Sequence, residues 1–255
     1  MTIAQAFRLT WRVLILFLIT AILTIVGTFH SWLIPKRKHH IYAPVYFKAW
    51  SKTLLTLFSV RLDLAFETGN KPDSGQLVIS NHSSPLDIVI LAYIFHGRFL
   101  SQIEIKHWPL IGYAARKLGT IFVNRGNAQS GMQAMTEIRK QLKMPGQPVV
   151  LFPESVASTG DKINRFRRGA FSAAKNTGIE VIPVGMAYPP GTEWIDETFV
   201  QHLRRVAVRP GGTIAVRVGH AYKLTDTPDK DAEIARGKIQ KLVNSARKAL
   251  DEGQP

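Results

Sequence analysis

A long uncharged stretch near the N-terminus most constrains how this chain can fold. Residues 13–35 include no Lys, Arg, Asp or Glu and are rich in Leu, Ile and Phe. As a helix, these 23 residues would extend roughly 35 Å, enough to cross a hydrocarbon core of about 30 Å. Trp11 and Trp32 lie near the two ends, where membrane proteins place aromatic side chains. A cleaved signal peptide is the alternative, but residues 27–32 make a poor cleavage site, so we expect an uncleaved anchor.

A second apolar stretch follows at residues 41–58, with Lys48 and Lys52 as its charged residues. It could lie in the membrane interface, return part-way through the membrane, or pack as a helix on a globular domain. Basic residues flank the first stretch on both sides, so the positive-inside rule leaves its orientation open.

These two stretches give the predicted domain organisation. We assign residues 1–58 to an N-terminal membrane anchor and residues 59–255 to a globular domain. The anchor is expected to contain a transmembrane or re-entrant helix at 13–35 and an interfacial helix at 41–58.

From residue 59 onward, strand patterns alternate with helical patterns. Short apolar or alternating runs predict strands at 60–67, 77–79, 120–123, 149–152, 181–184 and 213–218. Apolar spacing of three and four predicts helices at 86–95, 132–142 and 234–250, and residues 251–255 are expected to form a frayed tail. This alternation predicts an α/β fold with a central, mostly buried mixed sheet flanked by helices.

Charge and cysteine content narrow the possible partners. The chain has 33 Lys and Arg against 18 Asp and Glu, a net charge of +15, which suits nucleic acid, an anionic membrane or an acidic substrate. Because a charge-free anchor accompanies this excess and no nucleic-acid-binding motif is present, we expect an anionic membrane and no nucleic acid. The absence of cysteine excludes a disulfide scaffold and thiol catalysis.

The first candidate site residues follow the strand at 77–79. His82 comes just after that strand, where open α/β sheets place their sites. Ser84, Pro85 and Asp87 suit the N-cap, N1 and N3 positions of a helix. A capping box alone could therefore explain Asp87, without any catalytic role. A carboxylate at N3 also points back toward the preceding loop. There it could hold one ring nitrogen of His82 and leave the other nitrogen as a general base.

Two further strands end in charged residues. Arg125 follows the strand at 120–123 and suits an anionic group such as phosphate, whereas Glu154 follows the strand at 149–152. Either residue alone would be read as a surface or capping side chain. Three neighbouring strand ends that offer His, Arg and Glu indicate a site at one edge of the sheet.

Other catalytic templates do not match. The sequence contains no G-x-S-x-G, P-loop, G-x-G-x-x-G or H-E-x-x-H motif. No further cluster of His and carboxylate residues lies near His82 and Asp87, so we expect no metal.

The order of these motifs resembles that of a known family. Residues 81–87 read N-H-x4-D, and residues 119–125 read G-x-x-F-V-x-R. Further along the chain, residues 152–154 read F-P-E and residues 181–184 carry a proline, while a lysine-bearing segment lies at 106–112. Over residues 75–190 the chain is therefore similar to the glycerolipid acyltransferases, the 1-acylglycerol-3-phosphate acyltransferase family.

One motif departs from the family pattern. The family continues F-P-E with Gly-Thr-Arg, whereas this chain continues with residues Ser155 to Ala157. The missing Arg is linked with the phosphate of the acceptor, so the acceptor is less well defined than the reaction. Four basic residues could compensate: Lys106, Arg165, Arg167 and Arg168.

The resemblance implies a membrane-bound O-acyltransferase. It would move a fatty acyl group from acyl-coenzyme A or acyl carrier protein to the free hydroxyl of a lysophospholipid, and it would need no cofactor. The first candidate acceptor is 1-acyl-sn-glycerol 3-phosphate, and a lyso-aminolipid such as lyso-ornithine lipid is the alternative. The implied catalytic residues are His82 and Asp87, and the implied substrate-binding residues are Arg125, Glu154, Lys106 and Arg167.

The location and the rival functions follow from the same features. We expect the protein at the cell inner membrane or another cytoplasm-facing membrane, with the catalytic domain on the cytoplasmic side. One rival is a non-catalytic basic membrane-binding module, which would not depend on His82. The other is a hydrolase that uses the same His/Asp pair to cleave a lipid ester.

Overall fold

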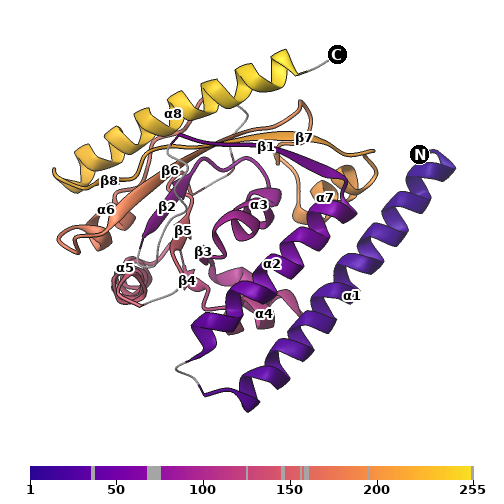
Figure 1. The fold of residues 1–255 in the computed structure, drawn as a ribbon, viewed down its shortest axis with the longest axis horizontal. Helices are drawn as coiled ribbons and strands as arrows, with labels where there is room; N and C mark the ends of the chain where they lie inside the picture. Colours follow the sequence, from indigo (N-terminus) through magenta and orange to yellow (C-terminus); the bar gives the residue numbers. More distant parts are fainter. Residues whose placement is uncertain are drawn as a thin grey trace.

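The fold is known from a computed structural model (Figure 1). It describes residues 1–35, 38–67, 76–124, 126–144, 147–155, 157, 161–194 and 196–253, and at His39 and His40 it describes the backbone alone.

The strands within these ranges form one mixed sheet. They are β1 (Val60–Phe66), β2 (Leu77–Ser80), β3 (Arg98–Gln102), β4 (Ile121–Val123), β5 (Val149–Leu151), β6 (Glu180–Ala187), β7 (Gly212–Val218) and β8 (Tyr222–Lys223). The order across the sheet is β1-β7-β6-β2-β5-β3-β4, and β8 pairs with β6. β7 and β8 run antiparallel to β6, and the other pairs are parallel. The carboxyl ends of β6, β2, β5, β3 and β4 therefore lie at one edge.

Helices cover both faces of this sheet, as Figure 1 shows. They are α1 (Ile3–Leu33), α2 (His39–Leu57), α3 (Leu86–Phe95), α4 (Ile111–Lys117), α5 (Ala128–Leu142), α6 (Gly169–Ala174), α7 (Phe199–Ala207) and α8 (Pro228–Glu252), with a 3-10 turn, η2 (Ile103–His107).

Alternation along the central strands divides the core into two layers. Leu77 and Ile79 of β2 pack with buried side chains of α5, α6 and α8. Val78, between them, packs on the opposite face with side chains of α2, α3 and α7. Because successive strand residues point to opposite faces, this apolar run is buried on both sides. The predicted fold class, an α/β fold with a central buried mixed sheet, is confirmed.

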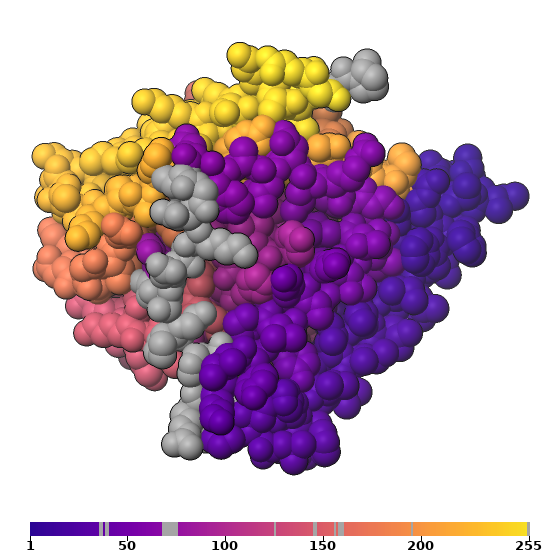
Figure 2. Space-filling view, viewed as in Figure 1, coloured from indigo at the N-terminus to yellow at the C-terminus, as the bar shows by residue number. Residues whose placement is uncertain are grey.

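The N-terminal helices form a hairpin along one flank of the molecule (Figures 1 and 2). α1 begins at Ile3, well before the charge-free stretch, because Thr2 and Gln5 form a reciprocal capping box. α2 packs against α3, and its side chains Phe47, Leu54 and Leu57 enter the core. The second apolar stretch therefore packs on the globular domain, while the division at residue 58 stays a prediction.

Two arginines attach α1 to the end of α7. Arg12 is 2% exposed, and it donates to the carbonyls of Ala207 and Arg209 at 3.1 and 2.5 Å. Arg8 donates to the carbonyl of Val208 at 2.8 Å. These contacts place cationic donors at a helix C-terminus, where carbonyl groups have no partner within the helix.

Among the described helices, α1 alone has the length and composition to cross a membrane. One side of it remains uncovered by protein. Its exposed apolar residues recur at spacings of three and four, at Ile3, Phe7, Trp11, Leu14, Leu18, Ile22, Ile25, Phe29 and Trp32.

Several short elements were not predicted from the sequence. β3, α4, α6, α7 and η2 lack a long periodic pattern, and β3 even begins with a buried arginine, Arg98. The expectation of a frayed tail from residue 251 is wrong for Asp251 and Glu252, because α8 continues through Glu252. Gln254 and Pro255 lie outside the described residues.

Close packing of α8 on the sheet makes a testable prediction. A Cβ on Gly185 of β6 would lie 2.5 Å from the backbone nitrogen of Val243 in α8. We expect Gly185→Ala to lower the free energy of unfolding by about 1–3 kcal/mol, because α8 must shift. Gly237, on the exposed side of α8, has nothing within 4 Å, and Gly237→Ala should raise the free energy by about 0.5–1 kcal/mol. Denaturant unfolding measures both variants, and an unchanged Gly185→Ala would contradict this packing.

Candidate active site

The carboxylate of Asp87 is the centre of the candidate site. It is completely buried in the first turn of α3. Its Oδ2 accepts hydrogen bonds from the backbone N–H groups of Ser83 and Ser84, at 2.7 and 3.0 Å. Its Oδ1 accepts a hydrogen bond from the hydroxyl of Tyr188. The two backbone N–H groups can only donate, and Tyr188 donates its hydroxyl, so the carboxylate accepts at both of its oxygens.

His82 is the fourth partner of this carboxylate. Its Nδ1 lies 2.7 Å from Asp87 Oδ2. Because the carboxylate accepts, Nδ1 carries the proton, and Nε2 of the neutral ring keeps its lone pair. In the described part of the chain no group hydrogen-bonds Nε2, and the side chain is 14% exposed. The ring is therefore partly exposed, and Nε2 is the nitrogen suited to accept a proton.

The capping geometry differs slightly from the prediction. The α-helix begins at Leu86, and the Oγ of Ser84 accepts from the backbone N–H of Leu86 at 3.3 Å instead of that of Asp87. The reverse half of the predicted box is present, since Asp87 accepts from Ser84. Asp87 therefore both caps the turn and holds His82.

Glu154 supports His82 from the next strand. Its Oε1 accepts from the backbone N–H of His82 at 3.0 Å, and its Oε2 accepts from the backbone N–H of Asn164 at 2.8 Å. The ring of His82 also stacks on Phe152, with ring centroids 4.3 Å apart. β5 thus fixes both the backbone and the ring plane of His82.

Asn81 locks the end of β2 to β6. Its side-chain amide donates to the carbonyl of Met186 at 2.9 Å and accepts from the N–H of Met186 at 2.8 Å. This pair continues the ladder of hydrogen bonds between the two strands beyond Ser80 and Val184. As a result, His82 and Tyr188 leave the sheet side by side, each close to Asp87.

Tyr188 is a site residue that the sequence reasoning missed. It follows the last residue of β6 and is 1% exposed. Burial and the neighbouring Asp87 raise the pKa of Tyr188 well above its usual value, so the hydroxyl stays protonated and donates. The strand-end rule that singled out His82 also applies to Tyr188, but a tyrosine within an apolar segment resembles a core residue.

Two other predicted site residues, Lys106 and Arg167, form no hydrogen bond or ion pair with Asp87 or His82 in the described part of the chain. Lys106 lies in η2, half-buried, and Arg167 is exposed, with its backbone N–H bonded to the carbonyl of Pro153. Arg125 lies outside the described residues. The expectation of three neighbouring strand ends is wrong for β4, because β3 lies between β5 and β4.

Ser155 has an unusual backbone for its residue type. Its φ is 66°, in the left-handed region that favours glycine. The family motif has Gly at this position, the residue that adopts such a φ at the lowest cost.

An apolar cavity of about 330 Å³ lies between the helical hairpin and the sheet domain. Its walls include Gly27 of α1, Phe47 of α2, Ile88 of α3, Phe99 of β3 and Leu118. Ile88 is the residue after Asp87, so the cavity meets the helix that carries the candidate site.

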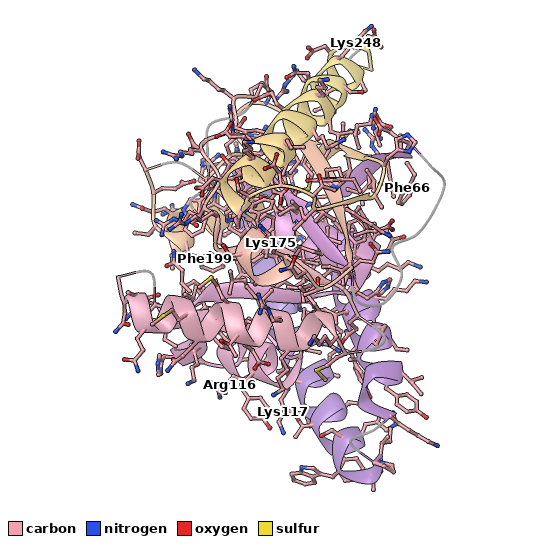
Figure 3. All side chains as sticks on the ribbon, turned by 90° about the vertical axis from the view of Figure 1, so that its left-hand side faces the viewer. Phe66, Arg116, Lys117, Lys175, Phe199 and Lys248 are labelled. Carbon is pink, nitrogen blue, oxygen red and sulfur yellow. The ribbon has the colours of Figure 1, made fainter. Side chains whose placement is uncertain are left out.

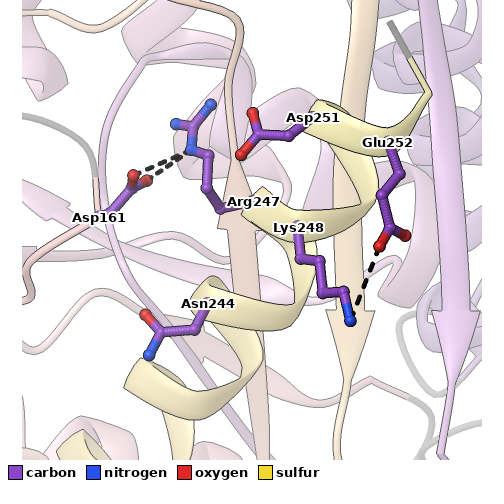
Figure 4. Close-up of a pocket in the computed structure, with 6 residues that line it drawn as sticks. All are labelled: Asp161, Asn244, Arg247, Lys248, Asp251 and Glu252. Atoms are coloured by element: carbon purple, nitrogen blue, oxygen red, sulfur yellow. Dashed lines mark hydrogen bonds and ion pairs between the residues drawn. The ribbon is translucent and has the colours of Figure 1, made fainter.

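A second hollow, of about 440 Å³, lies at the C-terminal end of α8 (Figure 4). It is lined by charged and amide side chains, among which Arg247 pairs with Asp161 at 2.9 Å. None of the candidate site residues lines it. Among the described residues, no group of three or more His, Cys, Asp or Glu side chains is arranged to hold a metal ion.

Fold and site together define a class of protein. A mixed α/β sheet that carries an N-H-x4-D turn at a central strand end is the arrangement expected of acyltransferases. Residues 64–187 match the sequence model of the family described as Acyltransferase. Over this segment, nearly half of the chain, the protein is similar to the members of that family.

Individual relatives show the same similarity. The 1-acyl-sn-glycerol-3-phosphate acyltransferase of Neisseria gonorrhoeae is 32% identical over 130 residues, which cover 50% of this chain and 51% of that protein. The lyso-ornithine lipid O-acyltransferase of Pseudomonas aeruginosa is 32% identical over 121 residues, 48% of this chain and 46% of that protein. This chain thus spans about half the length of these curated relatives.

The fold also matches a solved structure. The crystal structure of the 1-acyl-sn-glycerophosphate acyltransferase from Thermotoga maritima superposes with a TM-score of 0.72 at 18% sequence identity. The match covers 95% of this chain and 98% of that chain, including the region of the N-terminal helices.

The hydrogen bond from Tyr188 to Asp87 makes a testable prediction. Tyr188→Phe should lower the free energy of unfolding by about 1.5–3 kcal/mol, because a buried carboxylate loses a donor. Tyr222→Phe is the matched control, since the Tyr222 hydroxyl is buried without a hydrogen-bond partner in the described chain. Its removal should not lower stability. Equal losses in both variants, measured by denaturant unfolding, would contradict this role of Tyr188.

Proposed function

We propose that this protein is a membrane-bound O-acyltransferase that moves a fatty acyl group from a thioester to the free hydroxyl of a lysophospholipid. The observation that carries this proposal is the His82–Asp87 pair, with Nδ1 held at 2.7 Å and the His82 side chain 14% exposed. The similarity of residues 64–187 to the acyltransferase family supports the reaction class.

The geometry suits direct transfer without an acyl-enzyme. His82 Nε2 would remove the proton from the acceptor hydroxyl as that oxygen attacks the thioester carbonyl. The imidazolium that forms would be stabilised by Asp87, whose charge is fixed by three further donors. Collapse of the tetrahedral intermediate would release the thiolate of coenzyme A or of acyl carrier protein, and no cofactor or metal is required.

Two acceptors fit the available observations. The relative from Neisseria gonorrhoeae is named for 1-acyl-sn-glycerol 3-phosphate, and the one from Pseudomonas aeruginosa for lyso-ornithine lipid. We place 1-acyl-sn-glycerol 3-phosphate first, with phosphatidic acid as product, and assign its phosphate to Arg125, with Lys106 and Arg167 as further cationic candidates. The loss of the motif arginine after Ser155 favours lyso-ornithine lipid as the second candidate.

The apolar cavity beside α3 supports a lipid substrate. Its lining is mostly aliphatic and aromatic, and it opens between the hairpin and the domain, beside the helix that carries Asp87. An acyl chain placed there would lose contact with water while its polar end stayed near His82. We therefore propose this cavity as the place of a substrate acyl chain.

The membrane contact is proposed to be the exposed face of α1. Arg8 and Arg12 attach one end of α1 to α7, and Thr28 donates to the hydroxyl of Tyr113 in α4 at 3.4 Å near the other end. A helix attached along its length cannot also cross a bilayer. We therefore propose that α1 lies in one leaflet, on the cytoplasmic side of the inner membrane.

Basic side chains lie beside this face. Arg116 and Lys117 of α4 flank Tyr113, close to the N-terminal hairpin (Figure 3). They are placed to meet anionic lipid head groups, which attract cations near the bilayer surface.

His82 gives the direct test of the function. His82→Ala should reduce acyl transfer at least about 100-fold, because the general base is lost, while binding to vesicles is retained. The assay uses the purified full chain, 1-acyl-glycerol 3-phosphate or lyso-ornithine lipid, and acyl-coenzyme A or acyl carrier protein. His220→Ala is the control, since His220 is an exposed histidine beside Glu67. Turnover retained by His82→Ala would remove the proposal, and release of fatty acid without an acceptor would indicate a hydrolase.

The placement of α1 has its own test, for which a chain without cysteine is well suited. Single cysteines at Thr2 and Pro35, both exposed, mark the two ends of the helix region. When the protein binds preformed vesicles of anionic phospholipid, a membrane-impermeant maleimide outside should label both positions. Gly237→Cys, on the domain surface, is the positive control. Labelling of one end alone would show that α1 spans the bilayer.

A further inference from the structure

A second buried histidine lies behind the turn that carries the candidate site. His202 of α7 is 2% exposed, and its Nε2 lies 3.1 Å from the Oγ of Ser84. Its Nδ1 lies 2.8 Å from Glu197 Oε1, and Glu197 in turn pairs with Arg205. The result is a chain of hydrogen bonds from Arg205 to Ser84, the serine whose backbone N–H binds Asp87.

Two groups lie near Nδ1 of His202, Glu197 Oε1 at 2.8 Å and Arg205 Nη2 at 3.2 Å, and the shorter contact, with Glu197, sets the direction of these hydrogen bonds. The hydrogen bond from Arg205 lowers the pKa of Glu197, so Glu197 is an anion that accepts from Nδ1–H. Burial lowers the pKa of His202, so the ring is neutral and its Nε2 accepts from the hydroxyl of Ser84. The Oγ of Ser84 then has lone pairs for the N–H of Leu86, 3.3 Å away.

The loop before α7 also holds the turn of Ser83 and Ser84 through a second contact. The backbone N–H of Trp194 donates to the carbonyl of Ser83 at 2.7 Å, and its indole N–H donates to the carbonyl of Glu197 at 2.7 Å. Ser83 and Ser84 are the two residues whose N–H groups bind Asp87 Oδ2. Ser83 is therefore held through its carbonyl by Trp194, and Ser84 through its hydroxyl by His202.

This serine, histidine and glutamate do not form a nucleophilic triad, although their order resembles one. Ser84 is completely buried, so no substrate can reach its hydroxyl. The hydroxyl is also occupied on both sides, by His202 and by the N–H of Leu86. The hydroxyl of Ser84 can therefore act only by fixing the position of the turn between β2 and α3.

We propose that His202, oriented by Glu197, is a positioning residue that fixes Ser84 and thereby aims the backbone N–H groups of the turn at Asp87. This inference rests on the proposed general-base function of His82. A turn that is free to shift would move Asp87 and, with it, the ring of His82 relative to the reacting hydroxyl. A displacement of this kind lowers the rate of the chemical step, and it affects the affinity for substrate less.

Two conservative substitutions separate the two hydrogen bonds of His202. In His202→Gln, the amide oxygen can occupy the place of Nε2 and still accept from Ser84. In His202→Asn, the shorter amide can occupy the place of Nδ1 and bond Glu197, but it leaves Ser84 without an acceptor. We expect His202→Asn and Ser84→Ala each to lower kcat roughly 10- to 100-fold with KM little changed, whereas His202→Gln keeps most of the activity.

A double substitution tests whether the two residues act together. Because both changes remove the same hydrogen bond, the Ser84→Ala, His202→Asn protein should be no slower than the slower single variant. The measurements use the full chain on anionic vesicles with 1-acyl-glycerol 3-phosphate or lyso-ornithine lipid and acyl-coenzyme A. His220→Asn is the matched control on the surface and should leave kcat unchanged.

The possible outcomes are distinct. Unchanged kcat in His202→Asn, or equal loss in His202→Gln and His202→Asn, would overturn the proposal. A fall in Tm without a fall in kcat would also overturn it, since the residue would then serve stability alone. If His82→Ala stays active, the proposed function itself fails, and this result is separate from the behaviour of His202.

Discussion

A single buried carboxylate organises the candidate site. Asp87 lies in the first turn of α3, and burying its charge is possible only because four donors surround it. These donors come from the turn after β2 and from the end of β6, so the carboxylate connects two neighbouring strands. The plane and protonation of the His82 ring follow from that arrangement, and so does the lone pair at Nε2.

The sheet explains why such distant residues meet. β2 is central, and its neighbours β5 and β6 run parallel to it. The residues that follow these three strands, His82, Glu154 and Tyr188, therefore lie at the same edge of the sheet. Parallel strands require long connections, and the helix that follows β2, α3, carries Asp87 itself. The site therefore depends on strand order as much as on its motif residues.

The features that depend on local sequence patterns could be predicted from the sequence. The apolar strands, the turn from His82 to Asp87 and the long helices were predictable, because burial and capping leave regular signals. Strand order was not, and β3 was missed because its run of residues mixes buried Arg98 with polar side chains. Tyr188 and His202 were missed for another reason, since their roles depend on hydrogen bonds over more than 100 positions of chain.

The attachment of α1 to α7 has a consequence for how this protein would sense its surroundings. The arginines of α1 satisfy the carbonyls at one end of α7, and His202 in the same short helix holds Ser84. α7 therefore connects α1, the proposed membrane contact, with the turn that holds Asp87. If α1 lies in the bilayer as proposed, a tilt of α1 would reach Ser84 through the part of α7 between Ala207 and His202. On that proposal, the membrane would help to position the catalytic turn as well as supply the substrate.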